Sequence, residues 1–138
     1  MEAEFSIGER LAAEKDWHKS IVFTSKKNII ESHKCELQED EIEFYVRAFE
    51  DRDITVGNGF FVNGEHFDVH RFHPPLIYGR RGGPEEGEGV ALCRIKPKNP
   101  QDNEDSWFLL ITYLLPVLSA KAVPQMVKFS ERFLGTPE

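Results

Sequence analysis

The sequence lacks the features that direct a chain into or across a membrane. No stretch approaches the roughly 18 apolar residues that a membrane-spanning helix needs. The N-terminus, Met1-Glu2-Ala3-Glu4, has neither the basic region nor the apolar region of a signal peptide. We therefore expect an intracellular, cytoplasmic protein.

Cysteine is scarce, which limits the part that disulfides can play. The two cysteines, Cys35 and Cys93, lie far apart in the sequence. Because the sequence shows no secretory signal, we expect both to be reduced thiols that are buried or half-buried. The 138 residues, 40% of them hydrophobic, suffice for one globular domain over 1–138 without such covalent support.

Catalytic and metal-binding patterns are also missing. The glycine-rich segment Gly82–Gly89 lacks the Lys-Ser/Thr pair and the following helix of a phosphate-binding loop, so we interpret it as a solvated turn or an acidic contact loop. His66 and His70, with His73 and Cys93 as further candidates, could suggest a metal site. Residues four apart in a strand are about 13 Å apart, however, too far to share one ion through bonds of about 2 Å. We expect no metal, no cofactor and no enzyme activity.

Charge is unevenly distributed along the chain. The net charge of −7 argues against non-specific binding to nucleic acid. Between positions 71 and 98, however, basic residues outnumber acidic ones: Arg71, Arg80, Arg81, Arg94, Lys96 and Lys98 against Glu85, Glu86 and Glu88. This segment is either a binding patch or scattered solubilising charge.

The segment Gly59–Ile95 predicts the centre of the fold. Asn63-Gly64 lies between two β-prone runs, Phe60-Phe61-Val62 and Phe67–Arg71, and both central residues of a type I′ turn need positive φ. A second aromatic strand, Leu76–Tyr78, and an apolar strand ending at Ile95 follow. The segment therefore predicts an antiparallel meander.

Two helices and a hairpin are predicted before this meander. Helical spacing predicts a first helix over 2–15, and β-prone runs predict a hairpin of Ser20–Thr24 with Asn28–Ser32. A second helix over about 39–50 is indicated by apolar residues at i, i+3, i+4 and i+7: Ile42, Tyr45, Val46 and Phe49. The polar segment Asp51–Asn58 is interpreted as a loop.

A loop, a strand and a helix are predicted after the meander. Lys96–Ser106 contains two prolines and is expected to be a loop, whereas Trp107–Leu115 is almost continuously apolar and predicts a strand buried on both faces. Ser119 is expected to cap a C-terminal helix, and Pro124, tolerated only near a first turn, favours a start near Val123. The predicted fold is α+β, with an antiparallel sheet of about six to seven strands and helices on both faces.

Four segments in this order give the chain a family resemblance from about Ser20 to Gly135: GFFVNGEHFDVHR, LIYGRRG, EGVALCRIK and AVPQMVKFSERFLG. The sequence resembles profilin. Its spacing from the helix to the Asn-Gly hairpin is similar to that of the divergent, testis-type animal profilins. The resemblance implies N- and C-terminal helices on one face of the sheet and a smaller helix on the other. It also implies a monomeric protein of the cytoplasm and cytoskeleton, which binds monomeric actin and regulates actin polymerisation.

The resemblance also implies positions for the binding residues. The positions that match actin-contacting residues are Phe61, Val69, Arg71, Arg80, Arg81, Lys121, Gln125 and Lys128. Phosphoinositide head groups are expected to meet Arg80, Arg81, Lys96 and Lys98.

The groove for proline-rich ligands is expected to be degenerate. Most profilins line it with Trp, Tyr and His, whereas the matching positions here are Phe5, Ile30, Arg132 and Phe133. We expect weak or absent binding of proline-rich ligands, unless Trp17, Phe129 and Arg132 rebuild a platform from another direction. Two alternatives stay open: a profilin-fold adaptor with weak or lost actin binding that contacts phosphoinositides or another cytoskeletal partner, and a different α+β scaffold such as a trafficking light chain.

Overall fold

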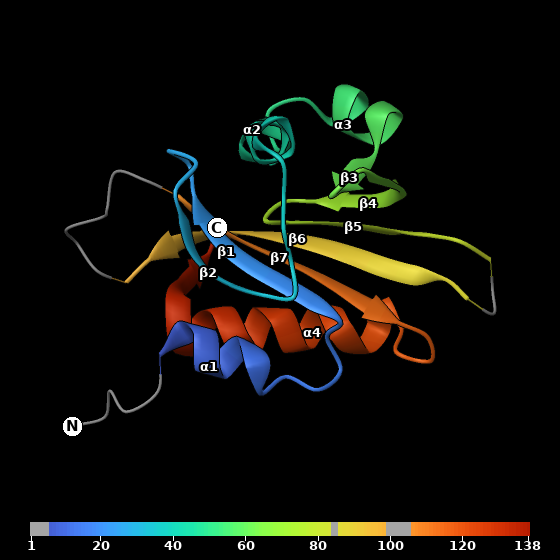
Figure 1. Cartoon of the computed structure of the whole chain (residues 1–138). Coiled ribbons are helices and arrows are strands. Elements are labelled where there is room, and N and C mark those ends of the chain that lie inside the picture. The colour runs from blue at the N-terminus through green and yellow to red at the C-terminus, as the bar shows by residue number, and fades with distance from the viewer. Residues whose placement is uncertain (1–5, 84–85, 99–105) are drawn as a thin grey trace.

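The computed structural model describes residues 6–83, 86–98 and 106–138. Phe5, the first residues of the predicted N-terminal helix and most of the predicted 96–106 loop lie outside these ranges. An antiparallel sheet forms the centre of the molecule (Figure 1). In the described residues, no helix is long and apolar enough to cross a membrane.

Seven strands follow the order β2-β1-β7-β6-β5-β4-β3 across the sheet. Their bounds are β1 (Lys19–Thr24), β2 (Ile29–His33), β3 (Phe60–Val62), β4 (Glu65–His73), β5 (Leu76–Arg81), β6 (Glu88–Pro97) and β7 (Trp107–Leu114). A short strand, β8 (Gly135–Pro137), pairs with the end of β6 that β5 does not reach. The predicted first hairpin, the meander and the last apolar strand are confirmed.

The hairpin of β3 and β4 turns at Asn63 and Gly64, as predicted. Both residues have positive φ, 48° and 88°, which is what a type I′ turn requires. The turn sets the register, in which Phe60 lies opposite Phe67 and Val62 opposite Glu65. Phe60 and Phe67 thereby point to the same face and are fully buried.

Helices cover both faces of the sheet (Figure 1). On one face, α2 (Glu39–Arg47) and α3 (Arg52–Asn58) close a core that includes Phe23, Tyr45 and Phe108. On the other face, α1 (Ile7–Ala12) and α4 (Ser119–Phe129) close a second core that includes Trp17, Leu109 and Met126. The predicted α+β arrangement, with the terminal helices together on one face, is confirmed.

Strand β7 holds the two cores together. Phe108 and Leu110 point into the first core, and Leu109 and Ile111 point into the second, all almost completely buried. Burying one such side chain contributes about 1.5–3 kcal/mol. This alternation explains why the sequence of the strand is apolar at nearly every position.

The N-terminal helix is shorter than predicted because its start is fixed by a capping box. The Ser6 hydroxyl accepts a hydrogen bond from the Glu9 backbone N–H, and the Glu9 carboxylate accepts one from the Ser6 backbone N–H. The helix then runs only to Ala12.

A helix replaces the loop predicted for residues 51–58. Asp51 caps it, because its carboxylate accepts a hydrogen bond from the backbone N–H of Ile54 at 3.1 Å. The Thr55 hydroxyl donates to the Ala48 carbonyl at 2.6 Å and thereby ties α3 to α2. The loop prediction was wrong. Gly57, Asn58 and Gly59 lie at the end of the helix and do not prevent the residues before them from being helical.

The C-terminal helix begins at Ser119, and Leu118 is its N-cap residue. The predictions that Ser119 is the cap and that Pro124 delays the start to Val123 were therefore wrong. The Ser119 hydroxyl pairs with the Tyr113 hydroxyl at 2.7 Å instead. Pro124 is tolerated inside the helix because the carbonyl that loses its partner belongs to Ala120, which is exposed to water. A π-helical turn, Ser130–Leu134, follows and leads into β8.

Both cysteines are buried free thiols, as predicted. Burial raises the pKa of Cys35 and of Cys93 to about 12. Both side chains therefore stay protonated near neutral pH and behave as small apolar groups.

Candidate binding surfaces

An open face of the sheet lies beside α4 on strands β4 and β5. Arg71 is paired with Tyr78, and Arg80 follows Tyr78 by two residues, so the three side chains share one face. Tyr78 packs against the core under α1 and α4, which identifies that face. We call the surface made by Arg71, Tyr78 and Arg80 the β4–β5 face.

A β-bulge places Arg71 on this face. The register of β4 against β5 shifts between Val69 and Arg71. Without the shift, residues two apart would point the same way, and Arg71 would follow Val69 into the core. Val69 is only 5% exposed, so this predicted contact residue offers almost no surface to a partner.

Two of the predicted contact residues on α4 contact Asp16, in the segment between α1 and β1. Lys121 Nζ is 3.1 Å from Asp16 Oδ2, and Gln125 Nε2 donates to the same oxygen at 2.9 Å. These hydrogen bonds, from Gln125 first and then Lys121, lower the pKa of the Asp16 carboxyl. Lys128 is exposed and lines a cavity with Phe133. Lys121 and Gln125 are therefore already engaged within the protein.

Arg81 has a structural role on the opposite face from Arg80. Arg81 Nη2 is 2.9 Å from the buried Glu88 carboxylate and 3.5 Å from that of Glu65. Its guanidinium also lies 5.5 Å from the centre of the Phe67 ring. Because its charge is engaged twice, Arg81 offers less to a partner than Arg80 does.

The predicted phosphoinositide residues do not form one cluster. Arg80 and Arg81 pair with the start of β6 at Gly89 and Glu88, whereas Lys96 lies near its other end. Eight residues of strand separate these ends by about 26 Å. Lys98 Nζ moreover donates to the Arg132 carbonyl at 2.8 Å.

The region between α1 and α4 contains the half-buried ring of Phe133, whose surroundings are charged. The guanidinium groups of Arg10 and Arg132 lie 4.7 Å and 5.1 Å from the centre of this ring. Trp17 and Phe129 pack together with ring centres 5.3 Å apart, but both are buried. Ile30 is half-buried against the same core, and Phe5 lies outside the described residues.

A cavity of about 530 Å³ lies in this region. Its lining is mostly polar and charged: Glu14, Gln125, Lys128, Phe129, Glu131, Arg132 and Phe133. Among residues 6–83, 86–98 and 106–138, the geometry shows no stack of free aromatic planes of the kind that a proline-rich ligand needs.

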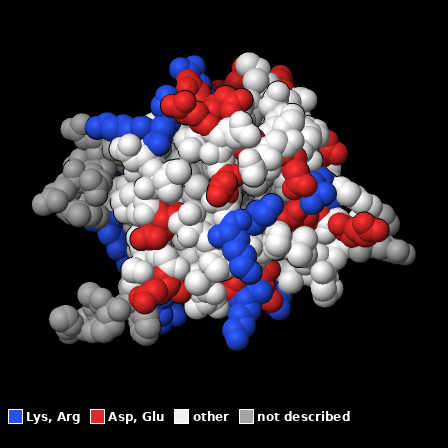
Figure 2. Space-filling model, in the orientation of Figure 1, with Lys and Arg blue, Asp and Glu red and all other residues white. Residues whose placement is uncertain are grey.

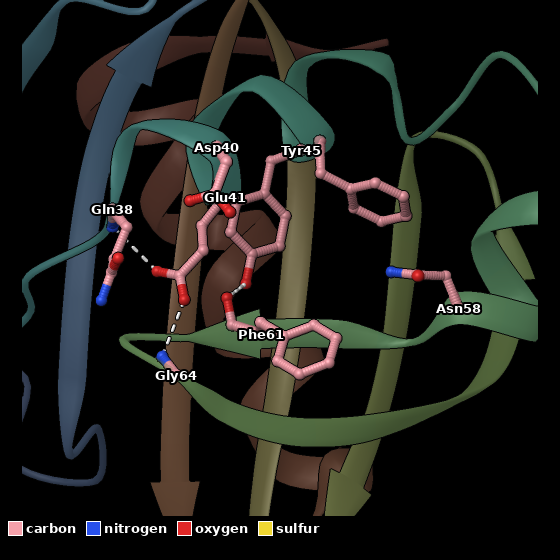
Figure 3. A pocket seen from close by; sticks show the side chains of 8 residues that line it. Gln38, Asp40, Glu41, Tyr45, Asn58, Phe61 and Gly64 are labelled. Carbon is pink, nitrogen blue, oxygen red and sulfur yellow. Dashed lines mark hydrogen bonds between the residues drawn. The ribbon is translucent and has the colours of Figure 1, made fainter.

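A second cavity lies between α2 and the β3–β4 hairpin (Figure 3). The Glu41 carboxylate, 7% exposed, accepts hydrogen bonds from the backbone N–H groups of Gln38, Asn63 and Gly64 at 2.8, 2.9 and 2.7 Å. The Tyr45 hydroxyl donates to the Phe61 carbonyl at 2.6 Å. Burial raises the pKa of Tyr45 well above its ordinary value, so the hydroxyl remains a donor.

Sequence reasoning missed the residues that hold this cavity. Tyr45 was interpreted only as part of an apolar stripe, and no contact was predicted for Glu41. One available signal was the Gln38-x-x-Glu41 spacing of a capping box before the helix. Phe61, predicted as an actin contact, lies at this cavity and is 38% exposed.

The strand order, the terminal helices on one face and the arginines of the β4–β5 face define a small α+β binding domain of the profilin fold. The family model for Profilin matches residues 5–97, more than half of the sequence. The chain belongs to the profilin family. Profilins are non-enzymatic proteins that bind actin, and this chain falls in that general class.

Solved profilin structures show the same fold. Profilin IA of Acanthamoeba castellanii superimposes with a TM-score of 0.69 at 16% identity, and the match covers 85% of this chain and 84% of that one. Profilin II of the same organism gives 0.67 at 16% identity, with the same coverage. The profilin of Schizosaccharomyces pombe gives 0.62 at 18% identity, covering 85% of this chain and 81% of that one. A comparison with curated proteins gives no significant match.

Proposed function

We propose that this protein binds monomeric actin through the β4–β5 face and the adjoining α4, and thereby regulates actin polymerisation. Family membership supports binding to actin in general terms. The observation that carries the choice of surface is the register of β4 and β5, which places Arg71 and Arg80 together on one face.

Electrostatics favour this surface as the one that meets actin. The protein carries a net charge of −7, and actin is also acidic, so the two molecules repel each other at long range. A basic surface reverses the repulsion locally and orients the encounter. Arg71 has no ion pair in the described part of the chain, so its charge is available to a partner.

The residues of the predicted actin set do not contribute equally to this proposal. Arg71 and Arg80 carry it, and exposed Lys128 adds charge at long range. Lys121 and Gln125 are held by Asp16, so they would have to exchange that partner for actin.

The test is sedimentation or calorimetry with actin monomers. The double variant Arg71→Glu, Arg80→Glu should weaken binding, because each lost charge pair costs about 1–3 kcal/mol when it is desolvated in an interface. Since about 1.4 kcal/mol corresponds to a tenfold change in affinity, we expect a loss of at least about tenfold.

The matched control is Arg47→Glu, Arg52→Glu. It changes the net charge equally, but both residues belong to the α2–α3 side and their side chains are 69% and 65% exposed. Equal weakening by the two double variants would show that only total charge matters and would reject this surface. If the unmodified protein forms no complex with actin, the actin proposal itself is wrong, and the hypothesis of a profilin-fold adaptor replaces it.

A further inference from the structure

The cavity between α2 and the β3–β4 hairpin, which we call the α2 cavity, has a volume of about 470 Å³. It lies on the far side of the sheet from α1 and α4 and beside the edge strand β3. Part of its wall is apolar and is formed by Phe44 and Phe61. The side chain of Asn58 points into it from the end of α3 (Figure 3).

The walls of the α2 cavity are held in place by hydrogen bonds. The Glu41 carboxylate ties the start of α2 to the hairpin turn, and the Tyr45 hydroxyl ties the middle of α2 to β3. The Phe44 ring packs edge-on against Phe60, with ring centres 6.4 Å apart. These contacts preform the cavity, so a ligand would not have to create it.

The polar lining of the α2 cavity suits a positive charge. Among the described residues, Asp40 and Glu41 are the charged groups that line it, and both are acidic. Glu41 is already engaged by three backbone donors, whereas Asp40 is exposed and has no hydrogen bond or ion pair in the described ranges. Asn58, whose amide N–H donates to the Gly59 carbonyl at 3.0 Å, adds an uncharged polar group to the lining.

Further acidic residues lie beside the α2 cavity, at the start of α2. The first turn of α2 is acidic at Glu39, Asp40 and Glu41. Figure 2 shows acidic side chains gathered at the top of the molecule, where α2 lies in Figure 1, with basic side chains beside them. A basic partner would therefore be attracted before it made any contact.

We propose that the α2 cavity binds a lysine or arginine side chain from a basic segment of a partner protein. The aliphatic part of that side chain packs between Phe44 and Phe61, and its cation lies against a ring face, an arrangement worth about 0.5–2 kcal/mol. The charged end pairs with the Asp40 carboxylate.

This site is independent of the proposed actin surface. The β4–β5 face belongs to the side covered by α1 and α4, whereas the α2 cavity lies on the side of α2 and α3. A partner could therefore occupy the α2 cavity while actin is bound. The proposal stands whether or not the protein binds actin.

The test uses a short acetylated and amidated peptide with one arginine between alanines, titrated into the ¹⁵N-labelled full chain. We expect saturable shifts of the backbone amides around Asp40, Asn58 and Phe61. The same peptide with citrulline in place of arginine keeps the shape but has no charge, and it should bind at least about fivefold more weakly.

Asp40→Asn should weaken binding of the arginine peptide about threefold to fivefold, as expected for one exposed ion pair. Glu39→Gln is the matched control, because it removes the same charge one residue away on the same helix, and Glu39 does not line the cavity. We expect it to change the affinity less than about twofold.

Three results would overturn the proposal. The first is the absence of saturable shifts at millimolar peptide. The second is equal binding of the arginine and citrulline peptides to the unmodified protein, a comparison that needs no variant to fold. The third is equal weakening by Asp40→Asn and Glu39→Gln, which would reduce the effect to general attraction by an acidic helix.

Discussion

Glu41 is a single residue that joins two elements of the fold. Its carboxylate accepts one hydrogen bond from Gln38, at the start of its own helix, and two from the turn residues Asn63 and Gly64. A carboxylate is suited to this position because it has acceptors only, and hydrogen bonds to a charged group contribute about 1.5–3 kcal/mol each. The geometry of the turn therefore depends on an acid that is distant in sequence.

We predict that Glu41→Gln destabilises the protein by about 1–3 kcal/mol. The amide keeps one acceptor oxygen but presents an NH₂ group to a backbone N–H, which leaves a donor facing a donor. Urea unfolding followed by tryptophan fluorescence measures the effect. Glu39→Gln, exposed in the same helical turn, should stay within about 0.5 kcal/mol. Equal stability of the two variants would show that the carboxylate does not secure the turn.

Asp16 and Glu14 form a second feature at the scale of residues. Hydrogen bonds from Gln125 and Lys121 lower the pKa of Asp16, whereas burial and the nearby Asp16 charge raise the pKa of Glu14. A lowered pKa means that Asp16 stabilises the fold above its ordinary pKa and that this contribution is lost as the pH falls through the folded value. The raised pKa of Glu14 has the opposite effect on stability as the pH changes, because folding favours the protonated form of Glu14.

We predict that carboxyl NMR titration will give Asp16 a midpoint below the ordinary value of about 3.9 and Glu14 a midpoint above about 4.3. Asp16→Asn should move the Glu14 midpoint down, since it removes the neighbouring negative charge. An unchanged Glu14 midpoint in this variant would show that the two carboxylates are not coupled.

At the scale of elements, α1 and α4 enclose a groove with few free aromatic planes. Trp17 and Phe129 are buried, and the ring of Phe133 lies next to the guanidinium groups of Arg10 and Arg132. A polyproline II ligand has no internal hydrogen bonds and relies on aromatic faces and on donors to its carbonyls. The buried position of Trp17 and Phe129 argues against the alternative platform that those residues could have formed.

We predict that decaproline binds weakly or not at all. Losing one aromatic hot spot commonly costs about 2 kcal/mol or more, so two losses take a ligand from about −8 kcal/mol, in the micromolar range, to about −4 kcal/mol, in the millimolar range. Titration of the peptide, followed by amide shifts, measures this affinity. Saturation at tens of micromolar would show that the groove is functional.

Some elements are encoded locally and others are not, which decides what the sequence predicts. The Asn63-Gly64 turn and the apolar strand β7 have strong local signals, and both were predicted. Strand β8 has none, because Gly135–Pro137 pairs with Ile95–Pro97 far away in the sequence. The capped helix α3 was missed because its Asp51 cap is less conspicuous than the glycines at its end.

The candidate sites likewise depend on contacts between residues that are distant in the sequence. The basic character of residues 71–98 is visible in the sequence, but the face on which Arg71 lies depends on the bulge after Val69, which strand periodicity does not reveal. The α2 cavity could not be predicted, because Glu41 and its turn partners are separated by 22 and 23 residues. The predicted phosphoinositide residues are close in the sequence, but Arg80 and Arg81 lie near the start of β6 and Lys96 lies near its other end.

At the scale of the whole molecule, the sheet separates two surfaces of opposite character. The side of α1 and α4 adjoins the β4–β5 face, with exposed Arg71 and half-buried Arg80, and the side of α2 carries an acidic cavity. The two cores share only the sheet, so each surface is supported by its own set of packed side chains. One small protein could therefore bind an acidic partner and a basic partner at the same time.

Hydrogen exchange on the complex with monomeric actin tests whether actin binds at the β4–β5 face and α4. We expect actin to slow amide exchange in β4, β5 and α4, residues 65–81 and 119–129. Exchange in α2 and α3, residues 39–58, should stay unchanged. Protection confined to α2 and α3 would contradict the assigned surface. Exchange that is the same with and without saturating actin would contradict the claim that this profilin binds actin.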